Sequence, residues 1–462
     1  MNFDGSAYMT TGQDVFSPKA LVSLLKKNID GDVVVAFSGG MDSTVLLRSV
    51  VTLRDEGDFP ASLRALHINH QISESANDWE NHCAKICVRY GVEFKSIRVS
   101  CGKNRFGIVT EAAARDARYE VFLAELQSNE TLLLGHHQDD NLETMLLHLM
   151  RGSGPLGLSG IPVYRKLGSG FLLRPLLGCS QSSLREFASR VKLDWILDNS
   201  NSDTTHHRNF LRRNVIPILE RRWPTLRKSI KKSMRACFEA QTLNVKLAEN
   251  DLEICEGMEQ GTLSVSKLLT LELLRRKNLI RLWVCKLGLS VPSWSKINLM
   301  ANELLLSREN ITILLKNHRI CRFNGLIYGL TPRVPLSQNK HLFPVAESSF
   351  ALLNNGELRT RIVKGEGIAL SLFSPSTIVE VAYRQGGERI KMFGRPGKTL
   401  KKTLNEHKVP PWVRETLPLI YLNGQLAFVP GFGADEKFMP TIGEYGCVYD
   451  WDSPIRVLGV QQ

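Results

Sequence analysis

Six residues near the N-terminus have the types and the order that suit phosphate binding: Ser38-Gly39-Gly40-Met41-Asp42-Ser43. They follow the apolar run 33–37, which predicts a buried strand, and they precede the leucine-rich segment 44–53, which predicts a helix. A glycine turn between a strand and a helix places backbone N–H groups at the helix N-terminus, where a phosphate chain binds. The sequence therefore predicts a phosphate-binding loop.

The side chains of this loop have separate expected tasks. Gly39 and Gly40 permit positive φ angles and a close approach of the ligand to the backbone. Asp42 can hold a Mg²⁺ that bridges phosphate oxygens, and Ser43 can donate to those oxygens. The Gly-Lys-Ser/Thr ending of a Walker A loop is missing. The alternative is a serine-glycine turn in which Asp42 only caps the helix.

A second cluster at residues 135–144 follows the predicted strand 131–135 and enters a predicted helix. Asp139, Asp140 and Glu143 lie within one helical turn, so their carboxylates share one face. Like charges repel, and the helix dipole offsets only part of that repulsion. A cationic ligand or a metal ion would stabilise this turn, although the turn can also merely cap its helix. Zinc is disfavoured because the two adjacent histidines of the cluster would point in opposite directions on a strand.

Two further sets of side chains are candidates for the same site. Arg115 and Arg118 lie three residues apart in the predicted helix 110–127, and paired guanidiniums suit a phosphate or an electron-rich base edge. Solvated surface arginines are the alternative. One of His67 and His70, at the end of a predicted strand, can line a nucleotide pocket, and a structural role is equally open.

Basic residues gather in two separate segments. Residues 208–232 hold six Arg and three Lys against the single acid Glu220, and residues 383–408 hold eight Lys or Arg against two Glu. The chain as a whole has a net charge of +13 and a pI near 9.3. Two separated patches suit a long polyanion such as RNA better than a small anionic metabolite. Solvated helix faces are the alternative for either patch alone.

The bulk composition describes an ordinary globular chain of two or three domains, with 462 residues of which 43% are hydrophobic. Nine scattered cysteines without a Cys-x-x-Cys pair indicate buried, reduced thiols. The N-terminal residues lack a basic and apolar leader, and no run of eighteen apolar residues occurs. We therefore expect a cytoplasmic protein that is neither exported nor membrane-spanning.

The first half of the chain alternates strand and helix patterns, which predicts an α/β fold with a doubly wound parallel sheet. The predicted strands are 32–37, 63–69, 93–99 and 131–135, and the predicted helices are 43–54, 75–90, 110–127, 139–151 and 180–191. A mainly helical pattern follows to about residue 305, with its clearest helix at 265–287. Short strands are expected within 311–330 around the turn Asn324-Gly325, and connecting loops within 333–375. A last unit at 378–450 has short strands and a helix at 398–407.

The expected domains are therefore three: a catalytic domain at 1–222, a helical domain at 223–335, and a small α+β domain at 336–462. The ligand site of the first domain should lie outside the carboxyl ends of its parallel strands.

Taken together, these motifs resemble those of the tRNA(Ile)-lysidine synthetase family, a branch of the PP-loop ATP pyrophosphatases. The motifs that carry the resemblance are spread over most of the chain: 38–43, Leu66-His67-Ile68-Asn69-His70, Glu111 to Tyr119, His136 to Thr144, Arg151-Gly-Ser-Gly154, Arg174-Pro-Leu, Asp198-Asn-Ser-Asn201, Arg208-Asn-Phe-Leu-Arg212, Tyr383 to Arg389 and Pro410 to Arg414. Met41 and Asn141 stand where the family more often has Pro and Gln.

The resemblance implies a ligase that modifies the wobble cytidine of an isoleucine tRNA with a CAU anticodon. The C2 oxygen of the base attacks the α-phosphate of ATP, pyrophosphate leaves, and the ε-amine of free L-lysine then displaces AMP. Since the lysine ammonium has a reference pKa near 10.4, a carboxylate or His137 must first accept its proton. Free lysine, the tRNA, ATP and Mg²⁺ are the expected partners, and a homodimer is allowed for.

The resemblance also implies roles for individual residues. The ATP-binding loop is 38–43, with Asp42 holding Mg²⁺ through the phosphates; the catalytic residues are Asp42, His137 and Arg115; the lysine-binding residues are Asp139, Asp140 and Glu143; the tRNA-binding residues are Arg208, Arg212, Arg389 and Lys401.

Three rival functions are weighed at this level. A PP-loop enzyme that thiolates tRNA would need suitably placed cysteines, and a glutamine-dependent ligase would need a glutaminase domain that the flanking segments do not suggest. A non-catalytic tRNA-binding protein would have no use for uncompensated carboxylates beside an RNA-binding surface.

Overall fold

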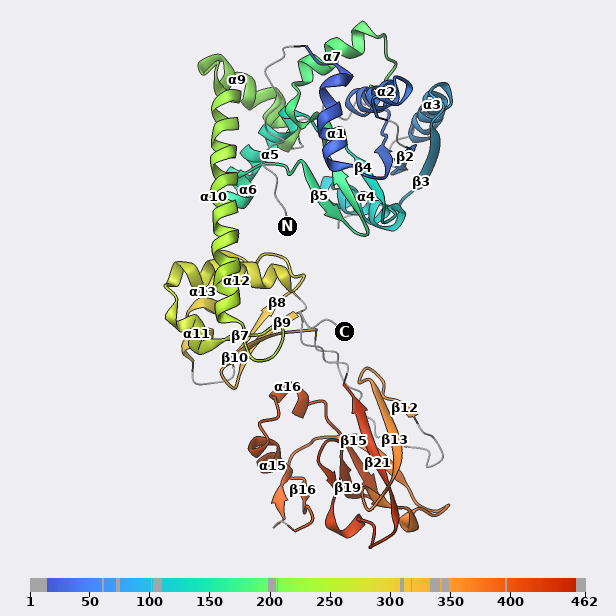
Figure 1. The fold of residues 1–462 in the computed structure, drawn as a ribbon, viewed down its shortest axis with the longest axis vertical. Helices are drawn as coiled ribbons and strands as arrows, with labels where there is room; N and C mark the ends of the chain where they lie inside the picture. The colour runs from blue at the N-terminus through green and yellow to red at the C-terminus, as the bar shows by residue number, and fades with distance from the viewer. Residues whose placement is uncertain are drawn as a thin grey trace. The chain divides into compact units, whose positions relative to one another are not determined.

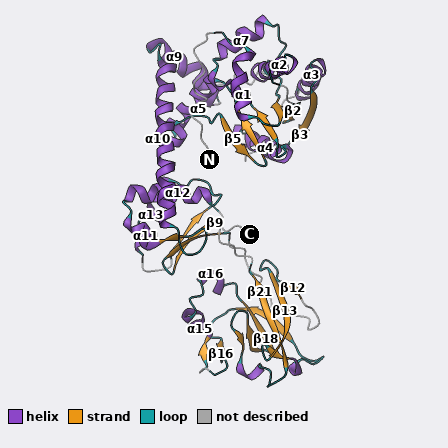
Figure 2. Ribbon diagram, viewed as in Figure 1, coloured by secondary structure: helices purple, strands orange, loops and turns teal. Residues whose placement is uncertain are grey.

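The computed structural model describes residues 15–59, 62–71, 75–100, 102, 110–197, 205, 207–307, 311–316, 318–332, 341–342, 349–394 and 397–453. The chain divides into two compact units, residues 1–243 and 244–462. Figure 1 shows the helices and strands of both, and Figure 2 separates them by type. The Asp198-Asn-Ser-Asn201 motif lies outside the described residues.

The first unit is built on a six-stranded sheet with the strand order β3-β2-β1-β4-β6-β5. Its strands are β1 (Asp32–Ala36), β2 (Leu63–Asn69), β3 (Glu93–Arg98), β4 (Glu130–Leu133), β5 (Tyr164–Leu167) and β6 (Gly170–Leu173). The first four are the strands that the sequence predicted. All neighbours are parallel except the pair β5–β6, which forms an edge hairpin that the sequence analysis missed.

Helices cover both faces of this sheet, as a doubly wound fold requires. They are α1 (Val22–Asn28), α2 (Met41–Asp55), α3 (Ala76–Arg89), α4 (Glu111–Glu125), α5 (Gln138–Met150), α6 (Pro155–Leu158) and α7 (Gln181–Arg190). The side chains of successive β1 residues are buried on opposite faces of the sheet. Val33 and Val35 pack with α1, α2, α3 and α7, whereas Val34 packs with α4. The predicted doubly wound sheet is confirmed.

A basic helical segment closes the first unit. It consists of α8 (His207–Phe210), a π-helical stretch at Leu211–Val215, α9 (Ile216–Arg222) and α10 (Leu226–Cys255), which runs on into the second unit. Leu211 and Ile216 pack against Leu142 and Leu146 of α5. This contact holds the basic segment against the helix that carries the acidic cluster.

The helical part of the second unit contains α11 (Val265–Thr270), α12 (Leu273–Lys286), α13 (Trp294–Ala301) and α14 (Glu303–Leu306). The single helix predicted at 265–287 is wrong, because Leu271 and Glu272 adopt extended backbone conformations and divide it in two. Leu271 turns into the core there, where it is 7% exposed. Beside these helices lies a sheet of β7 (Leu263–Ser264), β8 (Thr312–Leu315), β9 (His318–Phe323) and β10 (Leu326–Leu330), and the predicted turn Asn324-Gly325 joins the last two.

The C-terminal part of the second unit is mostly antiparallel. Its elements are β11 (His341–Leu342), β12 (Ser349–Ala351), β13 (Glu357–Lys364), β14 (Ile368–Ala369), β15 (Val379–Tyr383), β16 (Arg389–Ile390), β17 (Lys398–Thr399), α15 (Leu400–Glu406), α16 (Pro411–Arg414), β18 (Pro418–Leu422), β19 (Gln425–Val429), β20 (Gly433–Ala434) and β21 (Tyr445–Asp452). Within 333–375, where the sequence predicted only connecting loops, the strand β13 was missed; it pairs along its whole length with β21. Only one of its eight residues is buried, so its sequence carries little strand signal.

The helix predicted at 398–407 is confirmed by α15. Among the described residues, no helix combines the length and apolar character that crossing a membrane requires. The three domain ranges 1–222, 223–335 and 336–462 stay a prediction.

Candidate active site

The phosphate loop connects β1 to α2, and close packing against its backbone holds it in place. Gly39 has φ +81°, and a Cβ there would lie 2.5 Å from Ile196 Cδ1 and 2.8 Å from Cys83 Sγ. The Ile196 amide also donates to the Gly39 carbonyl at 2.9 Å. Only glycine therefore fits this position without strain. Ser43 Oγ donates to the Gly40 carbonyl at 3.0 Å, which closes the turn at the start of α2.

The turn after β4 packs directly against this loop. A Cβ on Gly135 would lie 3.2 Å from the carbonyl carbon and oxygen of Asp42 and from the Ser43 amide nitrogen. β1 and β4 are neighbours at the point where the strand order reverses, since β2 lies on the other side of β1. Ligands of open α/β sheets bind at such a point. The two clusters predicted from sequence therefore meet at one edge of the sheet.

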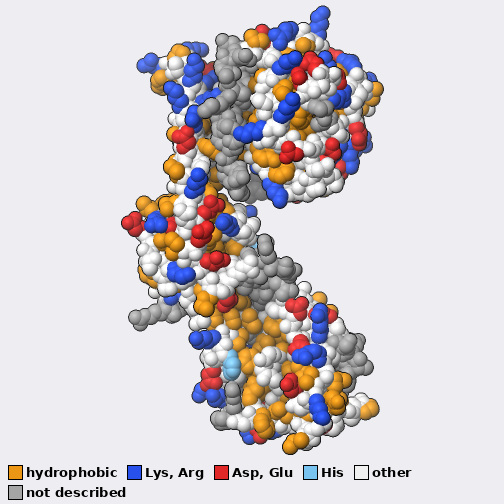
Figure 3. Space-filling view, in the orientation of Figure 1, with side chains coloured by type: hydrophobic (Ala, Val, Ile, Leu, Met, Phe, Trp, Pro, Cys, Tyr) orange, Lys and Arg blue, Asp and Glu red, His pale blue; other side chains and the backbone are white. Residues whose placement is uncertain are grey.

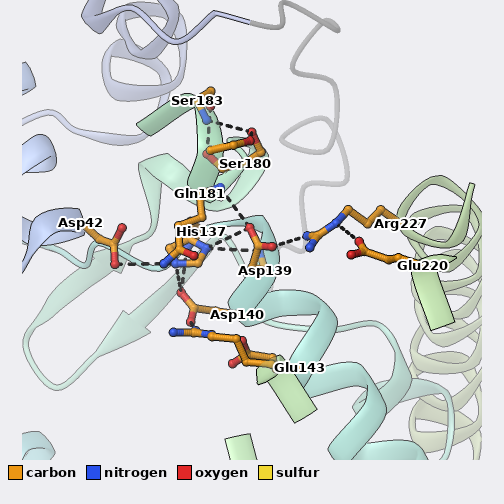
Figure 4. A network of polar contacts seen from close by, with 12 residues as sticks. Asp42, His137, Asp139, Asp140, Glu143, Ser180, Gln181, Ser183, Glu220 and Arg227 are labelled. Atoms are coloured by element: carbon orange, nitrogen blue, oxygen red, sulfur yellow. Dashed lines mark hydrogen bonds and ion pairs between the residues drawn. The ribbon is translucent and has the colours of Figure 1, made fainter. Parts of the chain in front are cut away.

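His137 links the two clusters (Figure 4). It is the N-cap of α5 and 1% exposed; its backbone N–H donates to Asp140 Oδ2 at 2.9 Å, and its ring Nδ1 accepts from the Asp139 amide at 3.2 Å. Its Nε2 lies 3.6 Å from Asp42 Oδ2 and 3.5 Å from Asp140 Oδ2. Burial lowers the pKa of His137, but Asp139, Asp140 and Asp42 outweigh it, so the pKa is raised. The buried ring thus lies among three carboxylates, which favour its protonated form.

The acidic turn is neutralised by arginines from the basic segment. Arg212 donates to Glu143 Oε1 at 2.6 Å and to Asp140 Oδ1 at 3.2 Å. Arg227 pairs with Asp139 and with Glu220 (Figure 4). Asp140 and Glu143, which their spacing places on one helix face, share Arg212, whereas Asp139 pairs with Arg227. The chain itself therefore supplies part of the positive charge that this turn requires, through two arginine pairings that were not predicted from the sequence.

A cavity of roughly 300 Å³ opens beside the phosphate loop. Its lining comes from the carboxyl ends of β1, β2 and β4 and from α4, and includes Ser38, Gly40, Asp42, Ser43, His70, Arg118, Gly135, His136 and Asp140. Burial and the nearby Arg118 lower the pKa of His70 to about 4, so this histidine is neutral at physiological pH.

Two buried carboxylate oxygens of this region have no hydrogen-bond partner among the described residues: Asp42 Oδ1 and Glu143 Oε2. Burial is the main cause that raises the pKa of both groups. An orphaned carboxylate oxygen at the mouth of a phosphate loop is suited to a hard divalent cation, so Asp42 fits Mg²⁺. No group of three or more His, Cys, Asp or Glu side chains in the described part of the chain is arranged as a metal site by itself.

The remaining predicted residues lie elsewhere. Arg115 is on α4 and donates to the Tyr119 hydroxyl at 3.4 Å, outside the lining of the cavity. Arg208 is on α8, and Arg389 and Lys401 are exposed on β16 and α15 of the second unit. Arg212 is held by the acidic turn, so its predicted contact with tRNA stays a prediction. Arg227 was missed as a site residue because it lies 88 residues from Asp139 in sequence.

Comparison with known proteins bears on the whole chain. A PP-loop domain model matches residues 15–219, a TilS substrate binding domain matches 263–328, and a TilS substrate C-terminal domain matches 379–451. The tRNA(Ile)-lysidine synthase of Coxiella burnetii is 37% identical over 445 residues, which cover 94% of this chain and 96% of the relative. The chain belongs to the tRNA(Ile)-lysidine synthase family.

Other members are similar along their length. The synthase of Serratia proteamaculans is 38% identical over 91% of this chain and 95% of its own, and that of Yersinia pestis is 34% identical over 92% and 95%. The family assignment made from the sequence motifs is confirmed.

The Gly39 geometry predicts a difference between two substitutions in the phosphate loop. Gly39→Ala should lower the free energy of unfolding of the first unit by about 2–4 kcal/mol, through positive φ and overpacking. Gly40→Ala is the matched control: Gly40 has φ −72°, and its nearest neighbour would be Ser38 Oγ at 3.6 Å. Urea denaturation measures the free energy of unfolding of both variants, and hydrogen exchange of the α2 amides reports the local stability beside the loop. Equal stability of the two variants would contradict the packing described.

The charge environment predicts that three histidines titrate differently. His137 should titrate above 6.5, while His70 titrates near 4 and His136, depressed mainly by burial, near 3. A raised folded pKa means that protonated His137 stabilises the fold below about pH 6.5, an effect lost as the pH rises through the folded pKa. Ring ¹⁵N NMR checks this, with His137→Gln identifying its resonance. A titration midpoint of His137 below pH 6 would contradict the placement of its ring among Asp42, Asp139 and Asp140.

Proposed function

We propose that this protein adenylates the wobble cytidine of an isoleucine tRNA bearing a CAU anticodon and then attaches free L-lysine to it. The observation that carries the proposal is the junction of a phosphate loop with an acidic helix start across one small cavity, in a chain similar to lysidine synthases along its length. ATP and the base must meet there, because activation and substitution occur at neighbouring atoms of a single nucleotide.

In the first step the C2 oxygen of cytidine attacks the α-phosphate of ATP, and the bond to the pyrophosphate group breaks. The backbone N–H groups at the start of α2 and the Ser43 hydroxyl hold the leaving pyrophosphate. Bound Mg²⁺, held by Asp42, would supply charge neutralisation at the phosphates. His137 Nε2 lies 3.6 Å from Asp42 Oδ2, so a protonated His137 would form an ion pair that orients this carboxylate before substrate arrives.

In the second step an amine of lysine attacks C2 of the activated base, the C2–O bond breaks, and AMP leaves with that oxygen. The carboxylates near His137 suit the ammonium groups of lysine. Asp139 is engaged by Arg227 and Gln181, and Arg212 donates to both Asp140 and Glu143. Glu143 is the favoured seat because its second oxygen, Oε2, is buried without a hydrogen-bond partner among the described residues. Glu143 also has a raised pKa, caused chiefly by burial, which makes it a better proton acceptor than an ordinary carboxylate.

The basic segment 208–232 is proposed to bind the tRNA. Figure 3 shows Lys and Arg side chains gathered over α9 and the start of α10. Those of Arg213, Arg221, Arg222, Lys228 and Lys232 are exposed. Arg208 and Arg212 are proposed contacts of the anticodon region, and Arg389 and Lys401 of another part of the tRNA; each phosphate contact contributes a salt-dependent increment to affinity. A cytoplasmic location and a homodimer belong to the same proposal.

The thiolase alternative is disfavoured by the chemistry of the nearby thiols. Burial raises the pKa of Cys83 to about 12 and that of Cys179 to about 11. A sulfur carrier must form a thiolate at neutral pH, and such groups do not.

The central test is incorporation of lysine. With ATP and Mg²⁺, the purified protein should transfer labelled lysine to an isoleucine tRNA bearing CAU and release AMP and pyrophosphate in equal amounts. A transcript with uridine at the wobble position is the control and should stay unlabelled. Absence of label on the cytidine transcript, or incorporation of sulfide in place of lysine, would refute the proposal.

The two orphaned carboxylates should separate the two steps. Asp42→Asn should lower kcat for adenylation at least about 100-fold, since it removes charge stabilisation in the transition state. Glu143→Gln should instead raise the KM for lysine, by about tenfold or more, with the KM for ATP unchanged. Both variants should bind tRNA within about twofold of wild type. Steady-state kinetics and fluorescence anisotropy measure these quantities; equal loss of tRNA binding in Asp42→Asn would indicate a structural role.

A further inference from the structure

Three arginine side chains converge on one phenol at the edge of the first unit. Arg115 and Arg174 each donate to the Tyr119 hydroxyl, at 3.4 Å and 3.3 Å. The guanidinium of Arg165 lies over the same ring, 5.3 Å from its centroid. Arg115 and Tyr119 belong to α4, Arg165 to the edge strand β5, and Arg174 follows β6. Residues distant in sequence thus bring three positive charges to one point.

This cluster has no negative partner in the described part of the chain. Arg174 is only 2% exposed; its Nη1 donates to the Pro162 carbonyl at 2.6 Å, and its buried Nε has no hydrogen-bond partner among the residues that the structure describes. Burying a guanidinium without an anion is costly, and a neutral phenol accepts hydrogen bonds without neutralising the charge. An anion would complete the arrangement.

The electrostatics of neighbouring groups agree with this. Burial lowers the pKa of Arg174 to about 10, with the charges of Arg165 and Arg115 adding to the effect. His136, which lines the cavity beside the phosphate loop, is kept neutral by burial first and then by Arg174. The positive region therefore begins directly behind a wall of the proposed active site.

We propose that Arg115, Arg165 and Arg174 form a binding site for a phosphodiester group of the tRNA, next to the nucleotide being modified. This inference rests on the proposed function, which supplies the RNA. Guanidinium forks match the oxygens of a phosphate. The RNA backbone is favoured over the ATP phosphates because none of the three arginines lines the cavity beside the phosphate loop. Arg115 is also exposed, so a phosphodiester can reach the cluster from solvent.

The test compares two neighbouring residues of β5 in the full-length protein. Arg165→Gln should weaken tRNA binding roughly tenfold and reduce the slope of log affinity against log salt by about 0.7, the value for one phosphate contact to a single strand. Lys166→Gln removes the same charge from an exposed side chain one residue further on and should stay within about twofold of wild type. The KM for ATP should be unchanged in both.

A neutral phosphate identifies the ligand. An anticodon stem-loop with one methylphosphonate beside the target cytidine should bind wild type about tenfold more weakly, yet cause no further loss in Arg165→Gln. Three outcomes would each overturn the site. The losses of affinity caused by the methylphosphonate and by Arg165→Gln could multiply, or Lys166→Gln could weaken tRNA binding as much as Arg165→Gln does. Alternatively, Arg165→Gln could raise the KM for ATP while leaving tRNA binding unchanged. Because binding is measured without turnover, a protein that behaves as expected here but never incorporates lysine would refute the proposed function and leave the phosphodiester site standing.

Discussion

The site depends on one close contact, between the turn after β4 and the backbone at the start of α2. Gly135 lies so near the Asp42 carbonyl that a methyl group in place of its hydrogen would touch it at 3.2 Å. Because β1 and β4 are hydrogen-bonded neighbours, the sheet fixes the separation of the two loops that follow them. The phosphate loop and the acidic turn are therefore positioned by the core of the domain, and neither can move without disturbing the other.

Charge pairing is the second constraint, and it acts through the same contact. Four carboxylates (Asp42, Asp139, Asp140 and Glu143) gather in a largely buried region, where like charges would repel strongly. Arg212 and Arg227 offset them by ion pairs, and the His137 ring, which lies 3.5–3.6 Å from Asp42, Asp139 and Asp140, offsets them when it is protonated. The compensation is incomplete, because Asp42 Oδ1 and Glu143 Oε2 have no hydrogen-bond partner in the described part of the chain. Those two oxygens are where a cation gains most, one beside the phosphate loop and one on α5.

Much of this was predictable from the sequence, because it follows from local pattern. The strands of the parallel sheet are recognisable in the sequence as apolar runs. The residues of the phosphate loop and of the acidic turn follow directly after two of these strands. What could not be predicted depends on distant partners or on weak pattern. β13 is paired by a strand some eighty residues later, and the helix 265–287 is divided because Leu271 packs into a core that only the fold defines. Arg212 and Arg227 find their carboxylates across 69 to 88 residues, with no local signal for either pairing.

Those long-range pairs change the meaning of the basic segment 208–232. Its excess of arginine and lysine suggests a uniform surface for RNA, yet two of its guanidiniums face inward and neutralise the acidic turn. The π-helical stretch that carries Arg212 packs through Leu211 against Leu142 of α5, so the inward and outward faces belong to one rigid piece. The positive charge of this element is therefore divided between different side chains: Arg212 and Arg227 neutralise the acidic turn, and Arg213, Arg221 and Arg222 stay exposed. Only the exposed set is available to the proposed RNA phosphates, so counting every basic residue of 208–232 overstates the surface that can bind RNA.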